Sequence, residues 1–266
     1  VVQRCLGLQE PGWERVPDPP VIPFGINGLR EDFGGFLRYS YCTPDFVMGT
    51  LMCEARPHSD WTGVAAQNRW QGVMFRGHPD AAIVPECTAV DTHLNLNNHQ
   101  NTMNQHWSVQ RKGSLITQKL KNPDYSTQTG DSKVWISAKG LSDPIEKDGW
   151  IFVASEGAYA AVHVVAGYKL EDSGEGGWWG VCEQDLSPIV IEVGRQSDHV
   201  SQEAFQSAVG ATEVSFDDHV LNYVGLSGDR FTFHADYSAL PSINGETINL
   251  APNRVYDSPF VQSQWD

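Results

Sequence analysis

The sequence predicts an all-β protein, a large antiparallel β-sandwich of the super-sandwich type with one short helix near residues 201–209. Short runs rich in aromatic and β-branched residues recur from residue 35 onward, and turn-forming residues separate them. Only one segment has a convincing helical pattern, and one helix among many strands favours a sandwich over an alternating α/β fold. The absence of a repeat of 20 to 50 residues argues against a propeller or a solenoid.

The composition predicts a folded, soluble protein. Hydrophobic residues make up 40% of the 266 residues, which is too high for a disordered chain. A formal charge of −15 disfavours nucleic acid and anionic membrane surfaces as partners. The longest apolar runs fall short of the roughly 20 residues that a membrane-spanning helix needs. We therefore expect neither a nucleic-acid nor a membrane partner.

The chain divides into two parts. Residues 1–34 are rich in proline and lack sustained periodicity, as expected of an extended segment that lies along another surface. Residues 35–266 form the antiparallel sandwich domain. The chain begins Val-Val-Gln, so we expect a processed mature protein or a piece of a longer one.

The predicted strands follow one another at short intervals. In order they are residues 36–41, 46–54, 68–75, 114–120, 133–138, 150–155, 158–165, 187–193, 220–226 and 230–235. Turns are expected at Asp217-Asp218, Ser227-Gly228 and Asn244-Gly245, which implies antiparallel meanders.

The helix is predicted from its ends as well as from its pattern. Ser201 can act as its N-cap and Glu203 lies in its first turn. Phe205 and Val209 are four residues apart, and Gly210 is a natural stop.

The five cysteines are an odd number, so at least one thiol is expected to be free. Cys42 and Cys53 lie on neighbouring predicted strands. They can form a disulfide in an oxidising compartment or remain buried thiols.

A polar segment over residues 91–112 interrupts this β pattern with three of the nine histidines. Asp91 and His93 would project from one face of a strand, and His99 follows six residues later. These three residues are candidate ligands of a structural divalent metal, zinc or calcium. The alternative is that they are solvated side chains of a polar loop.

The end of this segment has the residue types that recognise sugars. Asn104, His106, Trp107 and Arg111 supply an amide, a base, a stacking surface and a positive charge. Residues 67–71, which include Arg69 and Trp70, repeat this mixture. The alternative is that Trp107 belongs to the core and that its neighbours are surface residues.

Tyr159 and His163 are four residues apart on a predicted strand and therefore lie on one face of it. Such a pair can serve as base and acid in proton abstraction beside a carboxylate. Their apolar neighbours support the alternative, that both are core residues.

The segments RYSYCTPDFVMGT, QNRWQGVMF, NQHWSVQRKG, DGWIFVASEGAYAAVHVVAGY, SPIVIEVGRQSD and GDRFTFHADYS together resemble the C-terminal β-sandwich region of heparinase II/III-like polysaccharide lyases. The resemblance spans residues 39–259. It implies a helical toroid that faces the sandwich across a substrate cleft. It further implies a tyrosine and a histidine as proton-transfer groups and a zinc held by histidines and an aspartate. The H-x-H-x-D run expected at such an ion site is absent from this sequence, and so is the toroid.

The leading functional expectation is a lyase-type β-elimination of uronate-containing glycans. Tyr159, His106 or His163 would move protons, while Arg69 or Arg111 would offset the uronate charge. A toroid from the same or another chain would be needed for full activity. The alternative is a non-catalytic carbohydrate-binding or structural module. A glycoside hydrolase ranks lower, because no pair of carboxylates can be nominated. The expected partner is a polysaccharide or oligosaccharide, and the expected location is secreted or periplasmic.

Overall fold

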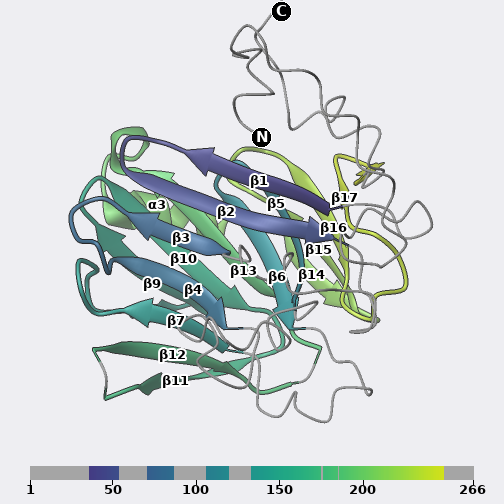
Figure 1. The fold of residues 1–266 in the computed structure, drawn as a ribbon, viewed down its shortest axis with the longest axis horizontal. Helices are drawn as coiled ribbons and strands as arrows, with labels where there is room; N and C mark the ends of the chain where they lie inside the picture. The colour runs from purple at the N-terminus through teal and green to yellow at the C-terminus, as the bar shows by residue number, and fades with distance from the viewer. Residues whose placement is uncertain are drawn as a thin grey trace, which may run out of the picture.

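The computed structural model describes residues 36–53, 71–86, 106–119, 133–174, 176–184 and 186–248. These residues form three antiparallel sheets and one α-helix, which confirms the predicted all-β sandwich (Figure 1). The proline-rich segment 1–34 lies outside the described residues.

The first layer, sheet A, has seven strands in the order β1-β2-β3-β4-β7-β12-β11. Their bounds are β1 Phe36–Cys42, β2 Phe46–Cys53, β3 Gly72–Phe75, β4 Ala82–Glu86, β7 Lys133–Ser137, β12 Gly177–Cys182 and β11 Tyr168–Asp172. It is the front layer in Figure 1.

The second layer, sheet B, has six strands in the order β5-β6-β13-β10-β9-β8. They are β5 His106–Arg111, β6 Ser114–Lys119, β13 Ile189–Arg195, β10 Ala158–Val164, β9 Trp150–Ser155 and β8 Ile145–Lys147.

The third layer is sheet C, whose five strands follow chain order. They are β14 Val214–Asp217, β15 Val220–Val224, β16 Arg230–His234, β17 Ser242–Ile243 and β18 Glu246–Thr247. The helix α3, Gln202–Gly210, packs beside sheet C on β10 and β9, and the short 3-10 helix η4, Gln196–Asp198, precedes it.

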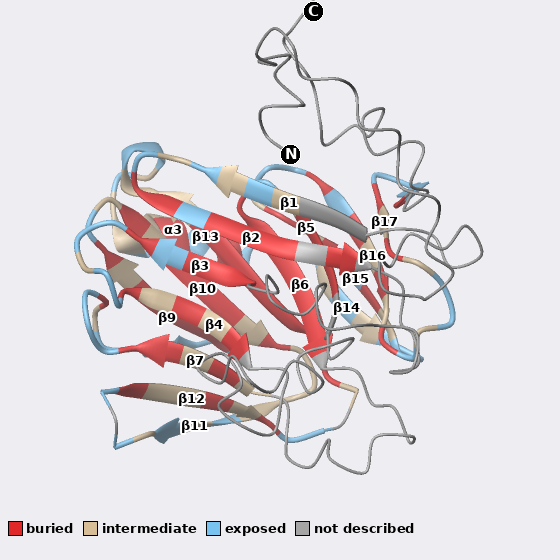
Figure 2. Cartoon of the chain, viewed as in Figure 1, coloured by how far each residue is buried: buried red, intermediate tan, exposed pale blue. Residues whose placement is uncertain are grey.

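Sheet B is the middle layer and is buried on both faces (Figure 2). One face contributes Leu115, Ile151, Val162 and Ile191 to the core shared with sheet A. The opposite face contributes a second set to the core shared with sheet C and α3, namely Val109, Ile116, Phe152, Ala161 and Val190. Because both faces are covered, β9, β10 and β13 read as nearly continuous apolar runs and do not alternate.

Helix α3 begins and ends close to where the sequence predicts. The Ser201 hydroxyl accepts a hydrogen bond from the Ala204 N–H at 3.2 Å, and Phe205 and Val209 are buried. Gly194 on β13 leaves room for the helix, because a methyl group there would lie 3.1 Å from the Phe205 ring.

The hairpin turns match the predicted positions, with one shift. Asn244 and Gly245 both have positive φ, as a two-residue type I′ turn requires. The predicted Asp217-Asp218 turn is instead formed by Asp218 and His219, with φ of 46° and 65°.

The proposed pairing of Cys42 with Cys53 is wrong. In the β1–β2 register Cys42 faces Val47, and Cys53 lies six residues further along β2. Six residues of strand span about 20 Å, far beyond the reach of a disulfide. Cys42 is an exposed free thiol and Cys182 is buried in the core. No helix in the described part of the chain is long and apolar enough to cross a membrane.

Candidate functional site

Most residues of the predicted metal and sugar sites fall outside what the structure describes. These are Arg69, Trp70, Asp91, His93, His99 and Asn104. His106 and Trp107 begin β5, opposite Lys119 and Gln118, but the positions of their side chains are not described. The metal site and the cleft around His106 therefore remain predictions. No group of three or more potential metal ligands occurs among the described residues.

Tyr159 and His163 lie on one face of β10, and that face points to the second core. Four residues of strand separate them by about 13 Å, too far for a direct proton exchange. The His163 ring stacks on Trp150 with centroids 4.9 Å apart, and its Nδ1 lies 2.8 Å from the Gly149 carbonyl oxygen. Burial lowers the pKa of His163, and Tyr159 packs on Phe205. This geometry supports the core interpretation of both residues.

Arg111 is engaged in an ion pair that joins sheets B and C. Its Nε lies 3.2 Å from the Oδ1 of Asp229, and Lys112 Nζ lies 3.7 Å from Oδ2. Ser227 and Asn244 donate hydrogen bonds to the same carboxylate at 2.6 and 2.9 Å. Burial alone would raise the pKa of Asp229, but these donors and the two cations together lower it. A structural role in this cluster is the better account of Arg111.

A buried carboxyl group lies nearby in the same interface. Glu192 on β13 is only 2% exposed, and it accepts hydrogen bonds from the Tyr223 hydroxyl at 2.6 Å and from the Ser114 hydroxyl at 2.7 Å. Burial raises the pKa of Glu192 to about 7 despite these donors. Gly225 allows this close approach, because a methyl group there would lie 2.3 Å from Ser114 Oγ. The cluster connects sheet B to sheet C and gives Tyr223 a fixed position.

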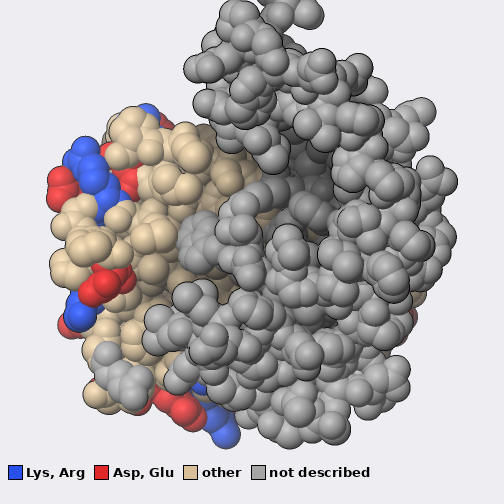
Figure 3. Space-filling model, viewed as in Figure 1, with Lys and Arg blue, Asp and Glu red and all other residues tan. Residues whose placement is uncertain are grey.

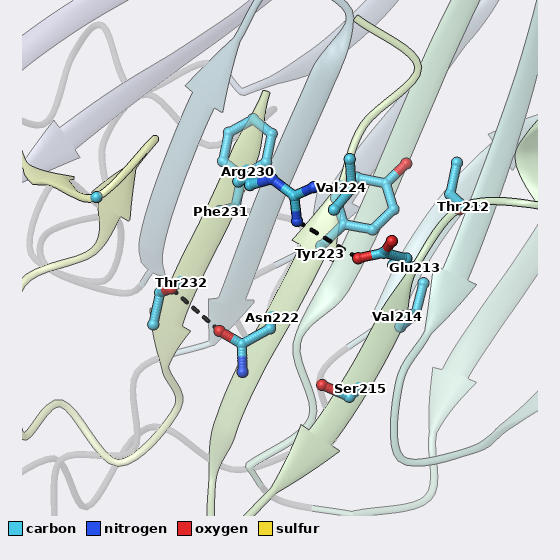
Figure 4. Close-up of a pocket in the computed structure, with 11 residues that line it drawn as sticks. Thr212, Glu213, Val214, Ser215, Asn222, Tyr223, Val224, Arg230, Phe231 and Thr232 are labelled. Atoms are coloured by element: carbon cyan, nitrogen blue, oxygen red, sulfur yellow. Dashed lines mark hydrogen bonds and ion pairs between the residues drawn. The ribbon is translucent and has the colours of Figure 1, made fainter. Parts of the chain in front are cut away.

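A groove of about 670 Å³ lies across sheet C, in front of Tyr223 (Figure 4). Its walls come from β14, β15 and β16 together with Thr212, Glu213 and Gly245. Arg230 Nη1 lies 3.4 Å from Glu213 Oε2, and further along the groove Thr232 donates a hydrogen bond to Asn222 Oδ1 at 3.1 Å.

The groove contains part of a continuous row of small polar side chains, Ser215, Asn222 and Thr232. Five residues are direct cross-strand partners in succession, one from each strand of sheet C: Ser215, Asn222, Thr232, Ser242 and Thr247. None of them is buried. Residues paired in this way share a face, at a spacing of about 4.8 Å between neighbouring strands. The row therefore presents hydroxyl and amide groups at regular intervals.

A second surface of a different kind occupies the outer face of sheet A. Trp135 on β7 and Trp179 on β12 are cross-strand partners, with ring centroids 4.9 Å apart and ring planes tilted by 57°. Both are partly exposed, whereas their strand neighbours Val134 and Ile136 are buried in the core. We call Trp135 and Trp179 the Trp pair.

Neighbouring residues hold the two rings in place. Gly177 lies under the Trp135 ring, since a methyl group at this glycine would come within 2.5 Å of it. The ammonium group of Lys133 lies 3.8 Å from the centroid of a Trp179 ring, a cation–π contact. Around this pair the outer face carries Val84, Val181 and Glu171. On the part of this face that is not covered in Figure 3, most charged side chains lie near the outer edge.

One half of the Trp pair has a signal in the sequence. In the segment 133–137 the residues alternate between partly exposed and buried, so Lys133 and Trp135 share the outer face. The segment 177–182 has no such pattern. Its glycines and two consecutive tryptophans do not alternate between polar and apolar residues, so the sequence does not indicate which tryptophan faces outward. Only the register of β7 and β12 brings the two rings together.

The fold and its surfaces define the class of the protein as a three-layered antiparallel β-sandwich with an aromatic pair on one outer face. Comparison with known proteins finds no matching family model, no similar curated protein and no similar solved structure.

Proposed function

We propose that the protein is a carbohydrate-binding module and that the Trp pair on sheet A is its binding site. The observation that carries the proposal is the pair itself, two partly exposed indole rings in contact on the outside of a sheet. Tryptophan has a large apolar surface and an N–H donor, which suits a sugar ring with one apolar face and a rim of hydroxyl groups. Isolated apolar residues are normal on a surface, but two adjacent tryptophans are a specific feature.

The rigidity of the surface supports the same proposal. Both rings project from paired strands in the interior of sheet A, and Gly177 and Lys133 fix their orientation. A binding surface that is already ordered loses little conformational entropy when a ligand binds.

The test is a binding measurement on Trp179→Ala, with Val181→Ala as the matched control. Val181 lies on the same face two residues further along β12, so the control truncates an apolar side chain without touching the pair. We expect Trp179→Ala to weaken binding to the preferred polysaccharide at least tenfold, about 1.4 kcal/mol. Affinity gel electrophoresis against a panel of plant, algal and bacterial polysaccharides provides the measurement. Equal retention of wild type and Trp179→Ala on every polysaccharide would refute the proposal.

Lyase-type β-elimination of uronate-containing glycans remains a second candidate. It rests on the resemblance to heparinase II/III-like proteins and on residues such as His106, Arg69 and Asn104, whose side chains lie outside the described part of the structure. A location outside the cell, and a helical toroid as a partner, belong to the same set of proposals.

A further inference from the structure

The groove across sheet C has the chemistry of a ligand site, and the proposed function does not use it. We infer that this groove is a second saccharide site, which takes a neutral sugar chain through hydrogen bonds. The inference extends the proposed function, but it uses a separate layer and separate residues, so each of the two sites can fail alone.

The first argument is the hydrogen-bonding capacity of the row. Serine and threonine hydroxyls both donate and accept, and an asparagine amide offers a carbonyl oxygen and an NH₂ group. A sugar hydroxyl also both donates and accepts, so it can pair with any of these groups. Among the described residues the side chains of Ser215 and Thr247 have no hydrogen-bond partner, and the only bond made by Asn222 is through its Oδ1. The row therefore has unused donors and acceptors.

The second argument is geometric. The row crosses all five strands of sheet C and keeps the direct cross-strand register throughout. Three members of the row, Ser215, Asn222 and Thr232, line the groove of about 670 Å³, and Ser242 and Thr247 continue the row on the next two strands. A site of this shape fits an extended chain of repeating units, and Figure 4 shows Asn222, Thr232 and Ser215 spread along it.

The third argument is electrostatic. The single described cation in the lining is Arg230, and Glu213 lies 3.4 Å from it. Asp217, two residues after Ser215 on the same face of β14, adds an exposed carboxylate. The surroundings of the groove are therefore negative on balance, in a chain of formal charge −15. This charge repels uronate and sulfate groups and leaves a neutral sugar as the matching ligand.

The aromatic side chains behind the groove have a structural role. Tyr223 and Phe231 are each 1% exposed, their rings stack, and the Tyr223 hydroxyl is bound to Glu192. They are not available for stacking on a sugar. We expect a site that binds by hydrogen bonds alone to have a lower affinity than the Trp pair. Each hydrogen bond to the sugar replaces one to water, so its net contribution to the binding free energy is small.

Two sites on different outer layers would allow one molecule to hold two glycan chains. Sheet B separates sheet A from sheet C, and the Trp pair lies on the outer face of sheet A. A polymer bound at both surfaces would be cross-linked, and the apparent affinity for it would exceed that of either site.

The decisive experiment is calorimetric titration of wild-type protein with cellohexaose, mannohexaose and xylohexaose, each uncharged. The groove variant is Thr232→Val. It replaces the hydroxyl by a methyl group, and the two side chains have nearly the same shape and both suit a β-strand. Ser238→Ala, at an exposed serine outside the groove, is the matched control. Thermal unfolding of each variant verifies the fold.

We expect one of the three oligosaccharides to bind wild-type protein with two molecules per chain. Thr232→Val should weaken the lower-affinity event at least tenfold and leave the other, while Trp179→Ala should do the reverse. A single event that Thr232→Val leaves unchanged, or no event with any of the three, overturns the inference. A single wild-type event that Thr232→Val weakens and Trp179→Ala leaves unchanged would refute the proposed function and leave the groove site intact.

Discussion

At the residue scale, the most informative side chain is Glu192. Ionised carboxylates are almost never fully buried unless they are paired with a cation. Glu192 has only hydroxyl and backbone donors around it, and Asp229 in the same interface adds a repulsive charge. The neutral form is therefore favoured, and the pKa of Glu192 rises from an ordinary 4.5 to about 7.

This shift makes the stability of the fold depend on pH. Between pH 4.5 and about 7 the folded protein holds a proton on Glu192 that the unfolded chain releases, so stability falls as pH rises through this window. A shift of this size corresponds to roughly 3 kcal/mol. Glu192→Gln keeps an oxygen acceptor for Tyr223 and Ser114 but cannot ionise. We expect it to match wild type in urea unfolding at pH 4.5 and to be the more stable protein at pH 8.

The control for this experiment is Glu246→Gln, an exposed glutamate on β18. Its unfolding free energy should follow that of wild type at both pH values. Parallel pH curves for wild type and Glu192→Gln would show that the buried carboxyl group does not govern this dependence.

At the element scale, the helix shows how far local sequence rules reach. The N-cap, the first-turn glutamate and the buried Phe205 and Val209 were all predictable, because capping and helical periodicity depend on neighbouring residues. The strands of sheet B were predictable for a similar reason. Burial on both faces makes them long apolar runs, as in β13, with five buried residues in succession.

Other elements could not be predicted because their patterns are set by distant partners. The strand β4 contains Pro85, and β8 and β11 are edge strands with mostly exposed side chains. The site residues show the same limit. From the sequence, Arg111 is a candidate to bind a uronate carboxylate. In the structure it is paired with Asp229, which lies 118 positions later in the chain. Trp135 and Trp179 meet only through strand register.

Ser201→Ala tests the capping of α3. The substitution removes the acceptor for the Ala204 N–H, and losses of this kind cost about 1 kcal/mol. We expect a lower unfolding midpoint in urea with an unchanged denaturant slope. Ser201→Asp should retain most of the stability, because a carboxylate also caps and interacts favourably with the helix dipole. Equal losses in both variants would argue against a capping role.

At the scale of the whole molecule, the middle layer forms the cores and the two outer layers provide the candidate binding surfaces. Sheet B contributes to both cores, while the outer faces of sheets A and C are the surfaces on which the Trp pair and the groove lie.

A sandwich of this kind would meet only one side of a lyase cleft, because the toroid that the resemblance implies is not part of this sequence. The chain alone should therefore release little or no unsaturated uronate from polygalacturonate, alginate or heparan sulfate, as followed by ultraviolet absorbance. A strong absorbance signal would restore the lyase interpretation.

The central claim, that the Trp pair binds carbohydrate, is tested most directly by the indole N–H resonances of the protein. Each of the nine tryptophans gives one such signal in a nitrogen-correlated NMR spectrum, and single substitutions to phenylalanine assign them. Titration with the polysaccharide fragment that wild-type protein retains best should shift the signals of Trp135 and Trp179. The signals of the buried Trp150 and of the core-packed Trp178 should stay in place. Shifts confined to other tryptophans, with Trp135 and Trp179 unmoved at saturation, would contradict the account.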